Sequence, residues 1–147
     1  MLLGISPLIS PELLKILAEM GHGDEIVLGD RNFPAATVAN RLVRLDGHGI
    51  IPVLSAILTL FPVDDFEPDP AMGMAVIDGD GTLAPALALM QDTLRGALGE
   101  DFRVAQLARV DFYTRARSAY AVVATGESLF YGDLILRKGV VAQEASQ

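Results

Sequence analysis

The chain has neither cysteine nor tryptophan among its 147 residues, and it has only two histidines. The absence of cysteine excludes disulfides, thiolate catalysis and cysteine-ligated metal sites. Only 11 residues are Lys or Arg, against 19 Asp or Glu, so the net charge of −8 argues against nucleic acid and anionic membrane partners. The longest apolar run, Ile50–Phe61, is interrupted by Pro52 and is too short to span a bilayer.

The first ten residues have no basic flank and no apolar segment of signal-peptide length, so we expect a cytoplasmic protein. A length of 147 residues predicts one domain, residues 1–147, with one substantial core. Hydrophobic residues make up 51% of the chain. This high value predicts strands covered on both faces, or a surface that is buried in an oligomer.

Helical and extended patterns alternate along the chain. Ser10-Pro11-Glu12 is a helix start, because it combines an N-cap residue, a proline at the first helical position and an acid in the first turn. The expected helices are 11–20, 50–60, 83–98 and 112–119, and the expected strands are 25–29, 41–45, 72–77, 102–108, 120–124 and 133–137. The alternation predicts an α/β fold, a three-layer α/β/α domain with a largely parallel central sheet.

In such sheets, ligands bind at the loops beyond the carboxyl ends of the strands. Three polar loops fit this rule: 30–32, 78–82 and 126–133. Arg109 and Tyr113 begin a helix after a strand, so they could join these loops.

Gly21-His22-Gly23-Asp24 stands at a helix-to-strand junction. The glycines allow a tight turn and close approach of a ligand, and a histidine there is a natural acid/base group near neutral pH. A helix C-cap followed by a polar turn is the structural alternative. Two roles for Asp24 stay open, since it could orient His22 or simply belong to the turn. The second histidine, His48, is expected in a turn, and no histidine pair has metal-ligand spacing, so no metal site is predicted.

The segment Met74–Leu83 offers another function. Asp78 and Asp80, after an apolar stretch, match the first motif of haloacid-dehalogenase-type phosphatases, in which the two acids serve as nucleophile and acid/base and help to hold Mg²⁺. The motif stands late in the chain, and the only lysines, Lys15 and Lys138, do not supply the expected phosphate-binding lysine. A Gly/Asp turn with Thr82 as helix N-cap is the structural alternative.

An ordered series of motifs covers nearly the whole length and resembles the RbsD/FucU family of monosaccharide mutarotases. The series is Met20-Gly21-His22-Gly23-Asp24-Glu25, Asp30, Asn32-Phe33-Pro34-Ala35, Arg109, Phe112-Tyr113, Arg115-Ala116, Thr125-Gly126-Glu127, Tyr131-Gly132 and Leu136-Arg137-Lys138-Gly139. The opening Ile5–Lys15 segment and the Phe-Tyr-x-Arg-Ala stretch resemble the fucose branch of the family more than the ribose branch.

The resemblance implies conversion between the α and β anomers of a monosaccharide, L-fucose or a related sugar, without a cofactor. It makes His22 the acid/base residue, and it makes Asp30, Arg109 and the stretch Tyr131-Gly132-Asp133 sugar contacts. A carboxylate such as that of Asp30 can accept hydrogen bonds from two vicinal hydroxyls, and a guanidinium such as that of Arg109 can donate two hydrogen bonds at once. The Tyr131 hydroxyl can relay a proton, so Tyr131 is a second catalytic candidate. Asp24 and Tyr113 are candidates for supporting roles behind these contacts.

The resemblance also implies a homo-oligomer, since members of the family form rings, often decamers. At position 133 the family usually has Asn where this chain has Asp. Asp⁻ only accepts hydrogen bonds whereas Asn also donates, so a side-chain contact at this position would change which sugar is preferred. A second functional class remains beside the enzyme, namely a sugar-binding or uptake accessory protein that holds the sugar without turning it over.

Overall fold

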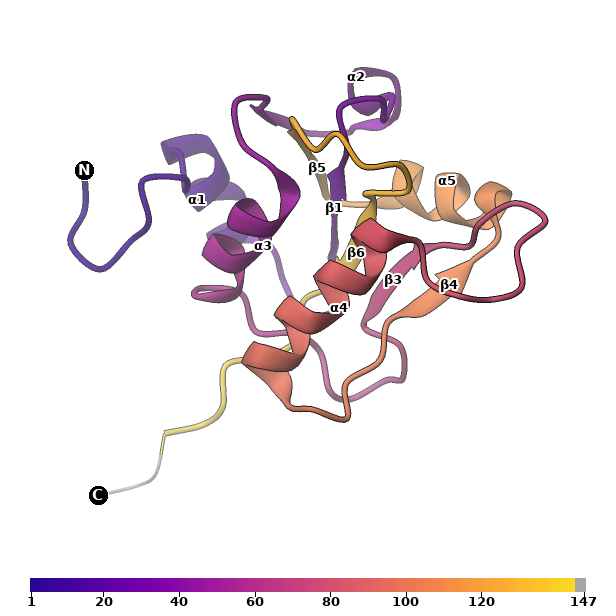
Figure 1. The fold of residues 1–147 in the computed structure, drawn as a ribbon. Helices are drawn as coiled ribbons and strands as arrows, with labels where there is room; N and C mark the ends of the chain where they lie inside the picture. The colour runs from indigo at the N-terminus through magenta and orange to yellow at the C-terminus, as the bar shows by residue number, and fades with distance from the viewer. Residues whose placement is uncertain (145–147) are drawn as a thin grey trace.

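A six-stranded sheet with the order β2-β5-β1-β6-β3-β4 forms the centre of the computed structural model, which describes residues 1–144 (Figure 1). The strands are β1 (Glu25–Gly29), β2 (Leu42–Leu45), β3 (Ala71–Met74), β4 (Ala105–Leu107), β5 (Ala121–Thr125) and β6 (Leu134–Arg137). The helices are α1 (Pro11–Glu19), α2 (Ala35–Val38), α3 (Ile50–Leu58), α4 (Pro85–Leu98) and α5 (Arg109–Ser118).

Strand direction in this sheet is parallel with one exception. β1 pairs in parallel with β5, β5 with β2, and β3 with β4. β6 lies between β1 and β3 and is antiparallel to both. The prediction of a largely parallel sheet is therefore confirmed, and the antiparallel β6 places its first residues beside the last residues of β1 and β3.

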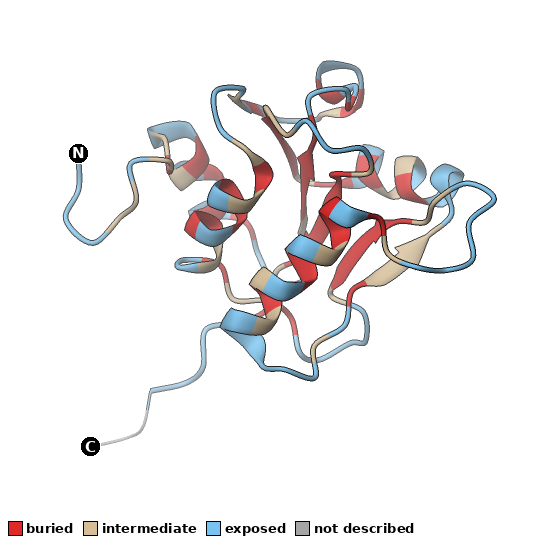
Figure 2. Cartoon of the chain, viewed as in Figure 1, coloured by how far each residue is buried: buried red, intermediate tan, exposed pale blue. Residues whose placement is uncertain are grey.

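The sheet is buried on both faces, which explains the high apolar content (Figure 2). Side chains alternate along β1, so Ile26 and Leu28 join the core formed with α1, α3 and α4, whereas Val27 joins the core on the opposite face. That second core contains residues of α2 and α5, including the fully buried Phe112. The three-layer arrangement predicted from the sequence is thus confirmed.

The local differences from the predicted elements are small. α1 begins at Pro11, and Ser10 caps it by accepting a hydrogen bond from the Leu13 amide. β3 ends at Met74, three residues before the predicted end. The four-residue helix α2 was not predicted. Within residues 1–144, no helix is long and apolar enough to cross a membrane.

Candidate functional site

The direction of β6 brings three distant segments together at one edge of the sheet. Asp30 follows the last residue of β1, Met74 is the last residue of β3, and Asp133 directly precedes β6. α5 begins at Arg109 after β4, on the face of the sheet that carries the second core. Residues at or beyond the carboxyl ends of β1, β3, β4 and β5 therefore meet here. Of the three predicted loops, 30–32 and 126–133 contribute to this site, whereas no residue of 78–82 does.

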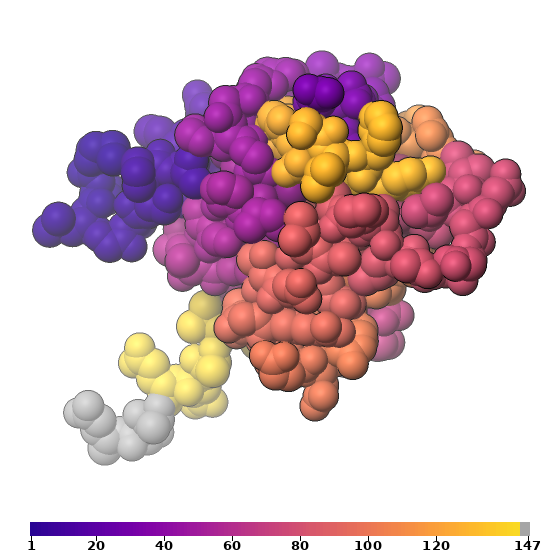
Figure 3. Space-filling view, in the orientation of Figure 1, coloured from indigo at the N-terminus to yellow at the C-terminus, as the bar shows by residue number. Residues whose placement is uncertain are grey.

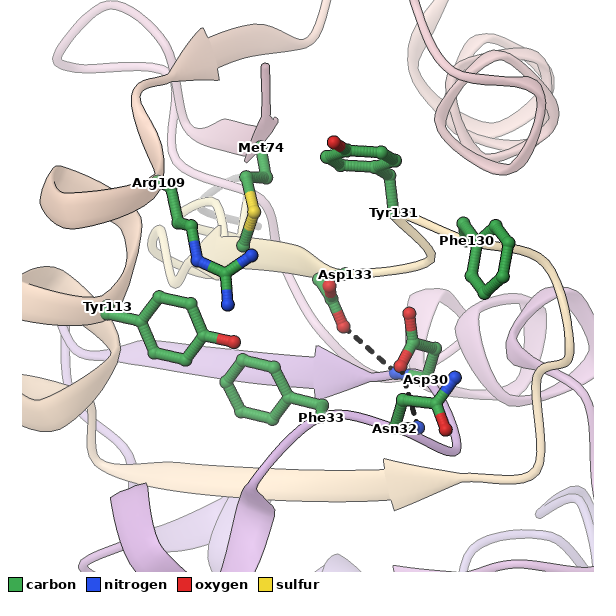
Figure 4. A pocket seen from close by; sticks show the side chains of 9 residues that line it. All are labelled: Asp30, Asn32, Phe33, Met74, Arg109, Tyr113, Phe130, Tyr131 and Asp133. Atoms are coloured by element: carbon green, nitrogen blue, oxygen red, sulfur yellow. Dashed lines mark hydrogen bonds between the residues drawn. The ribbon is translucent and has the colours of Figure 1, made fainter. Parts of the chain in front are cut away.

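These segments line an open pocket of about 380 Å³ (Figure 4). A volume of this size suits a small polar molecule. The pocket combines acidic, basic, hydroxyl and aromatic groups, and its lining consists of Asp30, Asn32, Phe33, Met74, Arg109, Tyr113, Phe130, Tyr131 and Asp133. Five of the residues proposed from the sequence, Asp30, Arg109, Tyr113, Tyr131 and Asp133, thus lie together.

The loop between β5 and β6 forms one wall of the pocket, and in the space-filling view this golden segment lies at the surface beside the violet loop that follows β1 (Figure 3). Glu127 anchors the loop, because its carboxylate accepts from the amides of Ile50 and Leu129 while its carbonyl accepts from the Arg31 amide. Tyr131 has a φ of 57°, in the left-handed region that non-glycine residues rarely adopt. The Tyr131 hydroxyl accepts a hydrogen bond from the Ile77 amide at 3.3 Å, which holds the end of the side chain.

Two carboxyl groups form the floor of the pocket. Asp30 and Asp133 are 7% and 5% exposed, and the Asp30 amide donates to Asp133 Oδ1 at 3.0 Å. Asp30 accepts from the amides of Asn32 and Gly132, at 2.9 and 3.3 Å. Gly132 is packed tightly, since a Cβ there would lie 3.2 Å from the Asp30 Cβ. Close packing therefore fixes the position of Asp30.

Aromatic rings and a cation form the opposite wall. The rings of Phe33 and Tyr113 stack with centroids 5.6 Å apart, and the Arg109 guanidinium lies 5.4 Å from the Tyr113 ring. Burial raises the pKa of the Tyr113 hydroxyl, so it is neutral at physiological pH. Arg109 and the Tyr113 hydroxyl point toward Asp133 (Figure 4). Aromatic faces beside hydrogen-bonding groups suit a sugar ring, which has both apolar and hydroxyl faces.

His22 does not line this pocket. It stands before the first residue of β1, whereas Asp30 follows the last, and the five residues of β1 span about 16 Å at roughly 3.3 Å per residue. His22 Nε2 lies 3.1 Å from Oδ1 of Asp64, and its ring packs on Phe66 with centroids 5.0 Å apart. In a single chain, His22 and the pocket therefore lie beyond opposite ends of β1.

Asp64 is the residue that the sequence analysis missed. Its side chain is 2% exposed, and Oδ2 accepts from Arg137 Nε at 2.8 Å. The Arg137 guanidinium holds the pKa of Asp64 well below its usual range. Asp24, the candidate partner of His22, instead closes the turn by accepting from the Gly21 amide at 2.8 Å.

No local signal marks Asp64, because its loop shows only acids and prolines. Phe130 and Met74, which line the pocket, were missed for a similar reason. Only the folded chain brings Phe130 and Met74 to the pocket and Asp64 to His22.

The acids of the phosphatase-like motif lie outside the pocket. Asp78 and Asp80 are in an exposed loop, four and six residues after the end of β3, and Asp80 accepts from the Thr82 amide. Lys138 donates to the carbonyls of Leu17 and Met20 at the end of α1. Within the described residues 1–144, no group of three or more acids or histidines is arranged to hold a metal ion. The turn alternative therefore fits this segment better than the phosphatase motif, but the prediction of Thr82 as N-cap is wrong, because α4 begins at Pro85 and its N-cap residue is Ala84.

Comparisons with protein families, with named proteins and with solved structures all point to the same family. The model of the RbsD / FucU transport protein family matches residues 3–141. A protein named L-fucose mutarotase from Histophilus somni is 48% identical over 141 residues, which cover 95% of this chain and 97% of that protein. Another protein of that name from Haemophilus influenzae is 46% identical over 140 residues, with the same coverage of each.

Solved structures include the fucose mutarotase from Streptococcus pneumoniae in complex with L-fucose. That chain is 44% identical to this one, and the two superpose with a TM-score of 0.89 over 96% of this chain and 100% of the other.

Proposed function

Because the chain belongs to the RbsD/FucU family, we propose that it is a mutarotase that interconverts the α and β anomers of L-fucose. The resemblance read from the sequence motifs is confirmed by the family match. The observation that carries the proposal is the pocket itself, which collects hydroxyl-binding groups on one side and stacked aromatic rings on the other.

Each polar group of the pocket has a chemical use toward a monosaccharide. Asp30 can accept from vicinal hydroxyls, since both of its oxygens have room for further donors beside the two backbone amides. Arg109 can donate to ring or hydroxyl oxygens. Tyr131 accepts from the Ile77 amide, so its own proton is available for the sugar. The Gly132 and Asp133 segment closes the floor beneath the sugar.

The reaction needs two proton transfers. The anomeric hydroxyl loses a proton and the ring oxygen gains one, the C1–O5 bond breaks, the C1 end rotates, and the ring closes on the other face. Acid/base groups that titrate near neutral pH serve both steps. We assign one proton to His22, and Tyr131 is placed to relay a proton at the rim of the pocket.

His22 can reach a sugar in this pocket only from a second copy of the chain, because β1 separates the two within one copy. We therefore propose a homo-oligomer in which the His22 turn of one copy covers the pocket of its neighbour. Exposed apolar side chains flank both surfaces: Phe66 (65% exposed) beside His22, and Phe130 (75%) and Ile77 (55%) at the pocket. Such apolar patches are typical of contact surfaces. Asp64 holds the ring of His22 in place for this role.

Exchange between the anomer signals of L-fucose in NMR saturation transfer tests the function. We expect the protein to accelerate exchange and His22→Ala to lower the rate by about 100-fold or more, within the range of general acid/base catalysis. His48→Ala is the matched control, because His48 lies in an exposed turn and its loss leaves the rate unchanged.

A second outcome would support the other functional class. If the protein binds L-fucose without accelerating exchange, it is a sugar-binding protein and not an enzyme. An active His22→Ala variant would instead reject the role of His22.

A further inference from the structure

The loop between β3 and α4, residues 75–84, carries the phosphatase-like motif and extends beyond β3 and β4 before it returns to α4 (Figure 1). This β3–α4 loop contacts the pocket through a hydrogen bond, in which the Ile77 amide donates to the Tyr131 hydroxyl oxygen at 3.3 Å. Because this donor occupies one side of the oxygen, the hydroxyl proton points away from Ile77. The position of the Ile77 amide therefore decides where Tyr131 can give its proton.

Backbone strain is concentrated at this contact. In the described part of the chain, residues 1–144, three non-glycine residues have a left-handed φ. Two of them are Tyr131 at 57° and Asp78, the residue after Ile77, at 55°. Such residues cost free energy, persist where the surrounding structure holds them, and cluster at functional sites. Strain on both sides of one hydrogen bond indicates that the fold favours this contact.

Gln106, in the middle of β4, holds the far end of the β3–α4 loop. Its Nε2 donates to the Gly81 carbonyl at 2.8 Å, and the Ala75 amide donates to the Leu107 carbonyl of the same strand at 2.8 Å. Gln106 Oε1 is buried and accepts no hydrogen bond from residues 1–144. Since an unpaired buried acceptor destabilises a fold, the amide nitrogen and not the oxygen explains why a glutamine stands here.

Hydrogen bonds inside the β3–α4 loop make it a single unit. The Gly79 amide donates to the Val76 carbonyl at 3.1 Å, and Asp80 Oδ1 accepts from the Thr82 amide at 3.0 Å. The two turns follow one another along the chain. A shift at the end that β4 holds therefore moves the end that contacts Tyr131.

We propose that Gln106 is a positioning residue of the mutarotase reaction, which holds the β3–α4 loop so that the Ile77 amide directs the Tyr131 hydroxyl proton toward the sugar. This role rests on the proposed function, in which Tyr131 relays a proton. Gln106 is not among the residues that line the pocket, so it acts through the β3–α4 loop and not on the sugar. Its loss therefore affects the rate of proton transfer more than the binding of the sugar.

The experiment measures kcat and KM for anomer exchange of L-fucose by the wild type and by Gln106→Met, whose side chain has a similar length and no N–H donor. We expect kcat to fall by about tenfold and KM to change by about twofold or less, because the Tyr131 hydroxyl loses its orientation. Gln91→Met is the matched control and keeps the kcat of the wild type. Gln91 Oε1 accepts from the Val104 amide at 3.1 Å, so it holds the segment before β4 and not the β3–α4 loop.

The variant Tyr131→Phe shows whether Gln106 acts through the hydroxyl group. In that background, we expect Gln106→Met to change kcat by less than about twofold, because there is no hydroxyl proton left to direct. A further tenfold loss overturns the proposal. An active wild type whose kcat is retained in Gln106→Met overturns it as well.

Hydrogen–deuterium exchange of single amides tests the contact without relying on Gln106→Met. We expect the Ile77 amide of the wild type to exchange about tenfold more slowly than the same amide in Tyr131→Phe, where its acceptor is missing. Equal rates overturn this proposal even if Gln106→Met does not fold, and they leave the proposed function standing. A wild type that does not accelerate anomer exchange overturns the proposed function, and the role of Gln106 with it.

Discussion

At the scale of single residues, Asp64 shows how a buried ion pair can serve a histidine at the surface. Its carboxylate accepts from Arg137 on one oxygen and contacts His22 Nε2 on the other. Because Arg137 keeps the pKa of Asp64 low, the carboxylate is charged at neutral pH. The charge holds the ring of His22 in one orientation and fixes which of its nitrogens faces away from Asp64.

We predict that Asp64→Asn lowers kcat for anomer exchange by about tenfold and changes KM less, because the ring of His22 loses its charged partner. Saturation transfer measured over a range of L-fucose concentrations separates the two constants. Asp65→Asn is the matched control, since Asp65 is the exposed neighbour in the same loop.

The double variant His22→Ala with Asp64→Asn distinguishes positioning from general damage. If Asp64 acts through His22, then Asp64→Asn has no further effect on the rate once His22 is absent. An additional tenfold loss in the double variant would contradict this role.

Sequence motifs identified the residues of the pocket better than they identified the partner of His22. His22, Asp30, Arg109, Tyr131 and Asp133 belong to motifs with distinctive neighbours, so their types and order were readable. Asp64 lies 42 positions from His22 along the chain, and only the fold brings them together.

At the scale of elements, most helices and strands followed from apolar periodicity and from capping residues. α2 was not predicted because it has only four residues and no side-chain cap. The direction of β6 could not be predicted either, since an apolar strand has the same pattern in a parallel or an antiparallel pairing. That direction decides the site, because it places Asp133 beside Asp30.

β6 also joins the pocket to the His22 turn. It begins after Asp133 and ends at Arg137, the partner of Asp64. The carbonyl of the next residue, Lys138, accepts a hydrogen bond from the Gly23 amide at 2.8 Å. The Lys138 ammonium group donates a hydrogen bond to the Leu17 carbonyl at 2.7 Å. The end of β6 therefore holds both the last turn of α1 and the turn that carries His22.

We predict that Lys138→Met lowers the free energy of unfolding by about 2 kcal/mol, because the last carbonyls of α1 lose a charged donor. Urea unfolding followed by circular dichroism measures the change. Lys15→Met is the matched control: Lys15 is exposed and 3.9 Å from Glu19, so its loss changes stability by about 0.5 kcal/mol or less. Equal losses of unfolding free energy in the two variants would show that the contact of Lys138 with the end of α1 does not stabilise the fold.

At the scale of the whole molecule, the proposed site requires two copies of the chain. We predict that two inactive variants, His22→Ala and Asp30→Asn, regain activity when they are unfolded together and refolded as a mixture. A pocket from the first variant can then receive His22 from the second, so about a quarter of the sites are intact when equal amounts assemble at random.

Saturation transfer on the mixture measures the recovery, and each variant refolded alone is the control. A mixture that stays as inactive as its components, while size-exclusion chromatography shows mixed oligomers, would contradict the shared site.

The distance between His22 and the pocket, fixed by the length of β1, limits which assemblies of this chain can have every pocket paired with a histidine. In the proposed assembly, each copy supplies a histidine to one neighbour and takes a histidine from another or from the same one. In an open row of copies, the pocket at one end and the histidine at the other end have no counterpart. Only a two-fold pair or a closed ring leaves neither unmatched, so the specific activity per chain becomes a measure of whether the assembly has closed.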